Sequence, residues 1–474
     1  MSQINETVVP ARAGKATAIC LSMSFALVFP GVAAADAVTD WNVKAAKAAL
    51  AACIEVPGSN DPGNESRMYA MMHVAIHDAL NAIDRRFHPY VFNGQGPTGA
   101  SREAAVASAA RNVLEPVISH FPFSKKCMED GIASVEADYL AAIAALPNNA
   151  ATMQGIEVGK SSAAAIVALR AKDGSDVSQV DDKYPQGTEP GEFRFVPGFD
   201  FAFGEAWGHV TPFVLKYASQ FRPRPPYHIR RKNYAADFNE VKPIRSKKYA
   251  ADLNEVKAFG GDDVTTPSLR TQDQTQLGLF WIEGSILTWN RIARTVSDKQ
   301  RLDLWENARL FGLLNLALAD AYIAHFDAKY HYKLWRPVTA AHLADSDGNP
   351  HTKGDPTWVP LQQNYPTPSY PSGHSTAGGA ASRVLQEFFG IDNIDFTVCS
   401  LTLPPGQRCT DPHPVYRSYL RFSQAAEENA LSRILVGLHF RNDVDEGLKF
   451  GRRIGHRAAN LFLGPVWCDF AETR

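Results

Sequence analysis

Two short stretches in the C-terminal half carry side chains that could bind an oxyanion and move protons on it. Lys329 precedes Arg336 by seven residues, and the run Ser372-Gly373-His374 follows. Lysine and arginine are cations that donate hydrogen bonds to oxyanions. Serine suits a helix N-cap, glycine lets an anion approach the free amides of the first turn, and histidine titrates near neutral pH. We therefore predict a helix starting at Gly373, and another that carries Lys329 and Arg336 on one face up to Pro337.

A third stretch contains Ser432-Arg433, His439 and Asp443. A carboxylate four residues from a histidine can bond one ring nitrogen and present the other as a ligand or nucleophile. Arg433 and His439 would point roughly 120° apart on one straight helix, so we predict a backbone break at Gly437. Singly, each stretch is explained by a solvated basic face or a chance helix start. Together they predict a pocket for a tetrahedral anion such as phosphate or vanadate.

The composition is that of a globular protein of 474 residues, with 45% hydrophobic residues, 21% charged residues and a formal net charge of −2. This balance excludes nucleic acid or an anionic membrane as a bulk partner. Residues 1–35 combine Arg12 and Lys15 with an apolar run and three alanines before Asp36. This pattern predicts a cleaved signal peptide, a secreted or periplasmic location and no membrane span after cleavage. Cys399 and Cys409 bracket a Pro-Pro-Gly turn and form the predicted disulfide.

Helical periodicity dominates the chain, and strand signals are scarce. The predicted helices are 41–52, 65–84, 102–120, 135–145, 153–171, 271–294, 298–335, 373–389, 415–437 and 442–463. We predict an all-α fold of two packed helical bundles, with the oxyanion site in the C-terminal bundle.

The expected division is an N-terminal bundle at 36–182, a Pro-rich connection at 183–266 and a C-terminal domain at 267–474. The connection includes a short tandem repeat, residues 234–242 and 249–257, to which we assign no function.

In this order, the three stretches resemble the signature of the phosphatidic acid phosphatase type 2 superfamily, which also contains the vanadium-dependent haloperoxidases. Several details are similar to the haloperoxidase branch: Trp335 before Arg-Pro, the run Tyr370-Pro-Ser-Gly-His-Ser-Thr, and the segment 67–78. The resemblance implies a vanadate cofactor, with phosphate as a competing oxyanion. It also implies hydrogen peroxide, a halide and a small-molecule acceptor as partners, and it leaves a homodimer open.

Carried over position by position, the resemblance implies a role for each signature residue. Vanadate oxygens would be held by Lys329, Arg336, Ser372, the Gly373 amide and Arg433. His439 would bind vanadium and be oriented by Asp443, and His374 would be the acid–base group. Thr367 stands where better-known haloperoxidases often carry Phe or His, a position linked with halide preference, so bromide or iodide is expected rather than chloride.

Two other functions fit the same residues. In an acid phosphatase of the superfamily, His439 would attack phosphorus to form a phosphohistidine, and His374 would protonate the leaving oxygen. A protein that only binds anions would need no proton shuttle, so the two histidines and Asp443 argue against that alternative.

Other histidine and acidic residues stand outside the three stretches. His73 and His77 are one turn apart, but their apolar surroundings favour packing in the bundle core over a metal pair. Asp320 and Asp327 could counter the cations of the pocket. Four histidines flank the first stretch, and the sequence does not choose among them: His325, His331, His342 and His351.

Overall fold

The computed structural model describes residues 36–56, 59–226 and 243–466. The predicted signal peptide and the first copy of the tandem repeat lie outside these residues. The N-terminal helices are α1 (Ala37–Ala51), α2 (Pro62–Ile83), α3 (Arg102–Ile118), α4 (Lys125–Ala144) and α5 (Ala150–Arg170). The later helices are α6 (Lys247–Phe259), α7 (Gln272–Phe280), α8 (Ser285–Gln300), α9 (Leu304–Tyr332), α10 (Pro337–Leu343), α11 (Gly373–Phe389), α12 (Phe422–Leu435) and α13 (Arg441–Leu461).

The remaining elements are short. Three antiparallel pairs join β1 (Glu55–Val56) to β2 (Ser59–Asn60), β3 (Val180–Asp181) to β4 (Ala202–Phe203), and β5 (Phe396–Cys399) to β6 (Tyr416–Tyr419). The 3-10 turns are η1 (Ala206–His209), η2 (Ala218–Phe221), η3 (Pro243–Arg245) and η4 (Ala344–Ser346). The all-α prediction is therefore confirmed.

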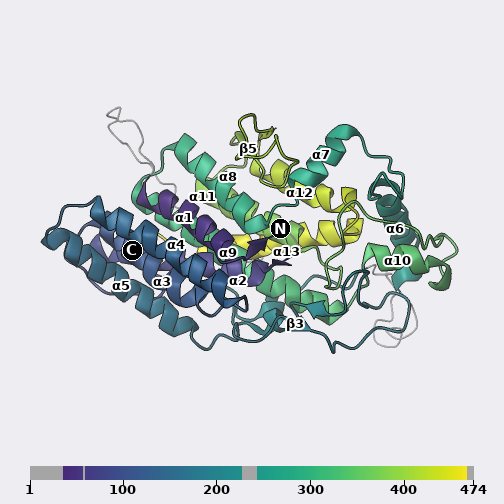
Figure 1. Cartoon of the computed structure of the whole chain (residues 1–474), viewed down its shortest axis with the longest axis horizontal. Coiled ribbons are helices and arrows are strands. Elements are labelled where there is room, and N and C mark those ends of the chain that lie inside the picture. Colours follow the sequence, from purple (N-terminus) through teal and green to yellow (C-terminus); the bar gives the residue numbers. More distant parts are fainter. Residues whose placement is uncertain (1–35, 57–58, 227–242, 467–474) are drawn as a thin grey trace, which may run out of the picture.

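The helices pack as two bundles that meet along α2 and α9. Helices α1 to α5 form the N-terminal bundle, and α9 packs with α11 and α13 in the C-terminal one (Figure 1). The largest apolar core runs through both bundles, from Val38 to Leu463. Helix α13 can lie close against α11 because Gly451 has no β carbon. A β carbon at this position would stand 1.9 Å from the carbonyl oxygen of Thr376. None of the described helices combines the length and apolar character that a bilayer crossing requires.

Three of the long predicted helices are wrong in extent. The range 415–437 begins with strand β6, and α12 starts only at Phe422. The range 271–294 is broken between α7 and α8, because Gly284 is the N-cap of a new helix. The range 298–335 is shortened at both ends. Arg301 is left-handed with φ 57°, and Asp303 starts α9 with a capping box completed by Glu306.

The Pro-rich segment runs along α9 toward the second stretch. Tyr330 donates a hydrogen bond to the carbonyl of Phe203, and Tyr370 donates one to the carbonyl of Arg224. The second copy of the repeat lies within α6, which supplies a hydrogen bond from Lys248 to Asn442 at the start of α13.

The described residues contain two disulfides. The predicted Cys399–Cys409 pair is confirmed. A second disulfide, Cys53–Cys127, ties the end of α1 to the start of α4.

Candidate active site

The first stretch leaves its helix before Arg336. Helix α9 ends at Tyr332, Lys333 is left-handed with φ 51°, and Arg336 is the extended N-cap of α10. The predicted continuous helix is wrong here, because a residue before proline is driven to extended backbone and Pro337 follows Arg336. Both cations nevertheless turn to one loop. Lys329 Nζ donates to the carbonyls of Pro368 and Ser369 at 2.6 and 2.9 Å, and Arg336 Nε donates to the carbonyl of Thr367 at 2.6 Å.

The second stretch starts a helix where the sequence predicts one. Ser372 is the N-cap of α11, and its Oγ accepts from the amide of Ser375 at 3.3 Å. Gly373 and His374 follow as the first helical residues, so their amides are among those that no helical carbonyl can satisfy. Ser372 also donates its own amide to the carbonyl of Asp443 at 3.0 Å, which joins the second stretch to the third.

The third stretch breaks at Gly437, as predicted. Helix α12 ends at Leu435, Gly437 has φ +79°, and α13 begins at Arg441. His439 therefore lies in the connection rather than in a helix. The pairing with Asp443 is still present, because Asp443 stands in the first turn of α13 and its Oδ2 lies 3.2 Å from His439 Nδ1.

The imidazole of His439 is held from both sides. Ser369 Oγ donates to the same Asp443 Oδ2 at 2.5 Å, and so does the amide of Phe440 at 3.2 Å. Asp443 is thus an acceptor to which His439 gives its Nδ1 proton. The lone pair is left on Nε2, which Arg336 Nη1 approaches to 3.1 Å. Sequence reasoning missed Ser369, because a lone serine outside a motif carries no signal.

Arg433 and His374 share a support that sequence reasoning also missed. Arg433 Nη2 donates to the carbonyl of Trp281 at 2.7 Å. The backbone carbonyls of Ile282 and Glu283 act on the imidazole of His374 and partly offset the lowering of its pKa. These three carbonyls belong to the turn 281–284 between α7 and α8. Carbonyls are common to all residues, so only the break between the two helices could have pointed to this turn.

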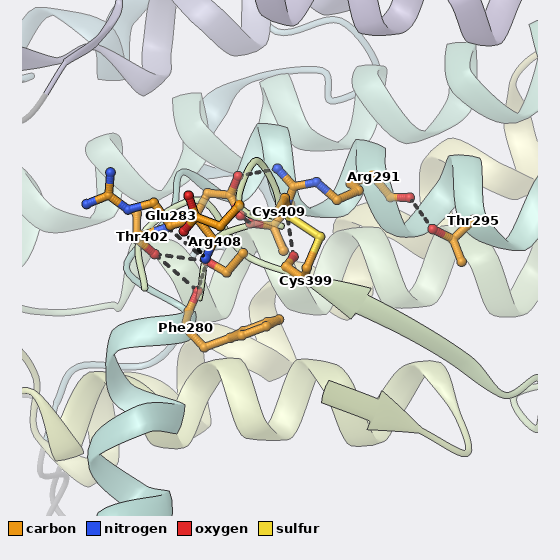
Figure 2. The surroundings of a disulfide bond; sticks show 11 residues. Phe280, Glu283, Arg291, Thr295, Cys399, Thr402, Arg408 and Cys409 are labelled. Atoms are coloured by element: carbon orange, nitrogen blue, oxygen red, sulfur yellow. Dashed lines mark hydrogen bonds and ion pairs between the residues drawn. A yellow bond between two sulfur atoms is a disulfide. The ribbon is translucent and has the colours of Figure 1, made fainter. Parts of the chain in front are cut away.

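The Cys399–Cys409 loop lies beside that turn (Figure 2). Thr402 Oγ1 donates to the carbonyl of Leu279 at 2.8 Å, and Arg291 Nη1 donates to the carbonyl of Cys399 at 3.0 Å. Arg291 also pairs with the carboxylate of Glu283. The disulfide loop is therefore hydrogen-bonded to the end of α7, directly before the turn, and is linked through Arg291 to Glu283 within it.

The site holds more positive than negative charge. Lys329, Arg336 and Arg433 are almost wholly buried, and Asp443 is a carboxylate that acts on the charges of Lys329 and Arg336. Burial lowers the pKa of Arg336 and of Arg433 to about 10, and burial with repulsion from Arg336 lowers the pKa of Lys329 well below its usual value. Burial raises the pKa of Asp443 to about 7. Three buried cations with one carboxylate favour a bound anion.

The two histidines are neutral in this setting. Burial and then the charge of Arg433 lower the pKa of His374 well below its usual value, and burial and then Arg336 do the same for His439. Among the described residues, His374 Nε2 and Arg433 Nη1 are buried without a hydrogen-bond partner. Donors and a lone pair are thus available to a small oxyanion, so the residues present fit vanadate or phosphate.

The other sequence candidates have different surroundings. Asp320 accepts the amides of Phe213, Val214 and Leu215, and Asp327 pairs with Arg222. The prediction that these two aspartates counter the site cations is therefore wrong.

His73 and His77 are buried in the core, as predicted. His73 bonds Asn42, and His77 bonds Asp78. The described residues contain no group of three potential metal ligands.

Sequence comparison relates the site region to known proteins. Residues 309–465 match the second helical-bundle domain of VCPO, the vanadium chloroperoxidases. The vanadium chloroperoxidase of Curvularia inaequalis is 30% identical over 239 residues, which is 39% of this chain and 39% of that protein. The vanadium-dependent bromoperoxidase of Ascophyllum nodosum is 31% identical over 173 residues, 32% of this chain and 28% of that protein. The match therefore spans well under half the length of each of these relatives.

Solved structures share the fold over most of the chain. A bacterial vanadium-dependent iodoperoxidase superposes with a TM-score of 0.69 at 24% identity, covering 90% of this chain and 97% of that one. An apo bacterial vanadium-dependent chloroperoxidase superposes with a TM-score of 0.62 at 14% identity, covering 83% and 91%. The helical-bundle fold of these proteins is therefore the fold of this chain.

Proposed function

We propose that this chain, whose residues 309–465 match the second helical-bundle domain of the vanadium chloroperoxidases, is a vanadate-dependent haloperoxidase that oxidises a halide with hydrogen peroxide. The observation that carries the proposal is the buried cluster of Lys329, Arg336 and Arg433 around the Nε2 lone pair of His439. A phosphate or vanadate anion would balance the charge of that cluster, and an imidazole lone pair adds a ligand for vanadium.

The residues that would hold the group follow from their remaining donors. Arg433 has five N–H groups, and two are engaged, by Ser432 Oγ and the Trp281 carbonyl. Lys329 has three, and two are engaged, by the Pro368 and Ser369 carbonyls. Arg433 and Lys329, with the first-turn amide of Gly373, can therefore donate to anion oxygens.

Arg336 and Ser372 complete this proposed set, and His439 Nε2 would be the vanadium ligand. Bound vanadate would supply a Lewis acid that activates peroxide for attack by halide.

The protein's own contribution is to orient groups and to move protons. Asp443 and Ser369 fix the tautomer of His439, so that Nε2 keeps its lone pair. Nε2 of His374 is buried without a partner among the described residues, so it would be the nitrogen that takes up or delivers a proton at the site. Burial of all these groups keeps bulk water from competing for them.

Bromide or iodide is the proposed halide. The support is Thr367, whose hydroxyl accepts from Arg336 Nη2 at 2.6 Å, so the residue at the position linked with halide preference contacts the site directly. Testing iodide, bromide and chloride in parallel measures this preference.

Export is also proposed, from residues 1–35. Asp36 caps α1 directly after the predicted cleavage point, and two disulfides suit an oxidising compartment. Determining the first residue of the protein recovered from cells tests cleavage before Asp36.

The decisive assay compares two activities of one metal-free preparation. Halogenation of an acceptor should require added orthovanadate, peroxide and bromide or iodide, and phosphate should inhibit it. Hydrolysis of a chromogenic phosphate ester that vanadate inhibits would instead identify the phosphatase acting through a phosphohistidine. His439→Ala should abolish halogenation, whereas His331→Ala, on the exposed side of α9, should not.

A further inference from the structure

His325 is a buried histidine beside the site that has no role in the assignments above. It lies on α9 one turn before Lys329, so both side chains leave the same face of the helix. It is 3% exposed and packs against the rings of Tyr322 and Phe326. A charge on His325 would interact with the site, because the charges of Lys329, His374 and Arg336 act on this imidazole.

The ring points with one nitrogen at the start of α11. A β carbon on Gly373 would lie 3.0 Å from His325 Nε2, and 3.3 and 3.4 Å from the two ring carbons that flank it. Because Nε2 is nearest and its neighbours are almost equally distant, the ring meets Gly373 end-on. Glycine at 373 therefore makes room for this imidazole as well as for an anion.

The tautomer of His325 follows from its other nitrogen. Nδ1 lies 3.1 Å from the carbonyl oxygen of Ala321, and a carbonyl can only accept, so Nδ1 carries the proton of the neutral ring. The lone pair is then on Nε2, beside the glycine whose amide would hold an anion oxygen. His374 presents a second Nε2 without a partner among the described residues.

An imidazole lone pair can accept a hydrogen bond but cannot donate one. It would repel a bare oxygen of an oxyanion and attract an oxygen that carries hydrogen. We propose that His325 Nε2 accepts a hydrogen bond from an O–H group of the bound oxyanion, so that the site selects protonated tetrahedral anions. This inference rests on the proposed oxyanion-binding function and adds a binding residue from α9 to it.

The test uses two anions of similar shape. Inorganic phosphate carries an O–H group at neutral pH, whereas sulfate does not. Binding of each to the full metal-free protein is measured by calorimetry for the wild type, His325→Phe, His325→Gln and the control His331→Phe.

We expect His325→Phe to weaken phosphate about tenfold, since one hydrogen bond is lost, and to leave sulfate unchanged or to tighten it, since the lone pair that repels a bare oxygen is gone. His325→Gln should recover part of the phosphate affinity through its amide oxygen, and His331→Phe should change neither anion. Unchanged phosphate binding, or an equal loss for both anions, would overturn the inference.

A second measurement decides the question if sulfate binds too weakly to be measured or if the His325→Phe variant does not fold. In protein with nitrogen-15-labelled histidine, the Nε2 resonance that is missing in His325→Phe should shift when phosphate is added to the wild type. No shift at that resonance would also overturn the inference. If the wild type binds both phosphate and vanadate and His325→Phe binds them with the same affinities, the role of His325 is refuted and the proposed function stands. If the wild type binds neither anion, the proposed function fails with it.

Discussion

Replacing Asp443 by asparagine separates the two ways in which this carboxylate acts on a bound anion. Three donors converge on its Oδ2, from Ser369, Phe440 and His439, whereas its buried Oδ1 has no hydrogen-bond partner among the described residues. In the Asp443→Asn variant the amide oxygen should therefore take the Oδ2 position and keep the orientation of His439. What the variant loses is the negative charge and the basicity that this charge lends to His439 Nε2.

The loss of charge should tighten the binding of both anions, whereas the loss of basicity at His439 should weaken the binding of vanadate alone. An anion at His439 Nε2 would lie roughly 7 Å from the carboxylate, across the imidazole ring, and a unit charge there costs roughly 2 kcal/mol at an effective dielectric of about 20. Removing it should tighten phosphate by up to roughly thirtyfold. The gain at neutral pH will be smaller, because a carboxyl with a pKa of about 7 is only partly charged. The affinity for vanadate should rise by the same factor from the loss of charge. It should also fall about 10- to 100-fold, because His439 becomes a less basic ligand.

The ratio of the phosphate and vanadate dissociation constants therefore isolates the ligand effect. Calorimetric titration of both anions should show that ratio falling about 10- to 100-fold in Asp443→Asn. The control is Asp327→Asn, which removes a carboxylate that pairs with Arg222 away from the site cations and should leave the ratio unchanged. If both affinities change by one factor, His439 does not bind vanadium. If phosphate binding weakens, the charge argument itself is wrong.

Three further predictions concern packing, the disulfide loop and proton uptake. Gly451→Ala should lower the free energy of unfolding by about 1–3 kcal/mol in denaturant titration, because α11 and α13 must separate; unchanged stability would contradict this packing. Replacing Cys399 and Cys409 by serine should weaken phosphate binding severalfold while α-helical circular dichroism persists, because the turn whose Trp281 carbonyl holds Arg433 loosens; unaltered binding would refute that role. Phosphate binding in mildly alkaline buffer should take up protons, because a bound anion raises the pKa of Lys329, which burial and then repulsion from Arg336 have lowered; calorimetry in buffers of different ionisation enthalpy would show release if this is wrong.

Much of the fold follows from the sequence because helix signals are local. Apolar periodicity and caps locate most helices, and the spacing of Arg433 and His439 required the break that Gly437 provides. The errors have the same local origin. Pro337 already forbids a helical Arg336, and the Asp303–Glu306 capping box already marks the start of α9.

The supporting parts of the site could not be predicted, because they come from contacts distant in sequence. The Trp281 carbonyl meets Arg433 across 152 positions, and Ser369 meets Asp443 across 74. A backbone carbonyl has no sequence signature, and one serine or one histidine among many has little. His325 is recognisable only once Gly373 is placed beside it.

A crystal structure of the protein grown with orthovanadate tests the central claim most directly. We expect electron density that joins the anion to Nε2 of His439, with the side chains of Lys329, Arg336 and Arg433 around its oxygens. An anion bound away from His439, or a site that stays without anion density at saturating vanadate, would contradict it.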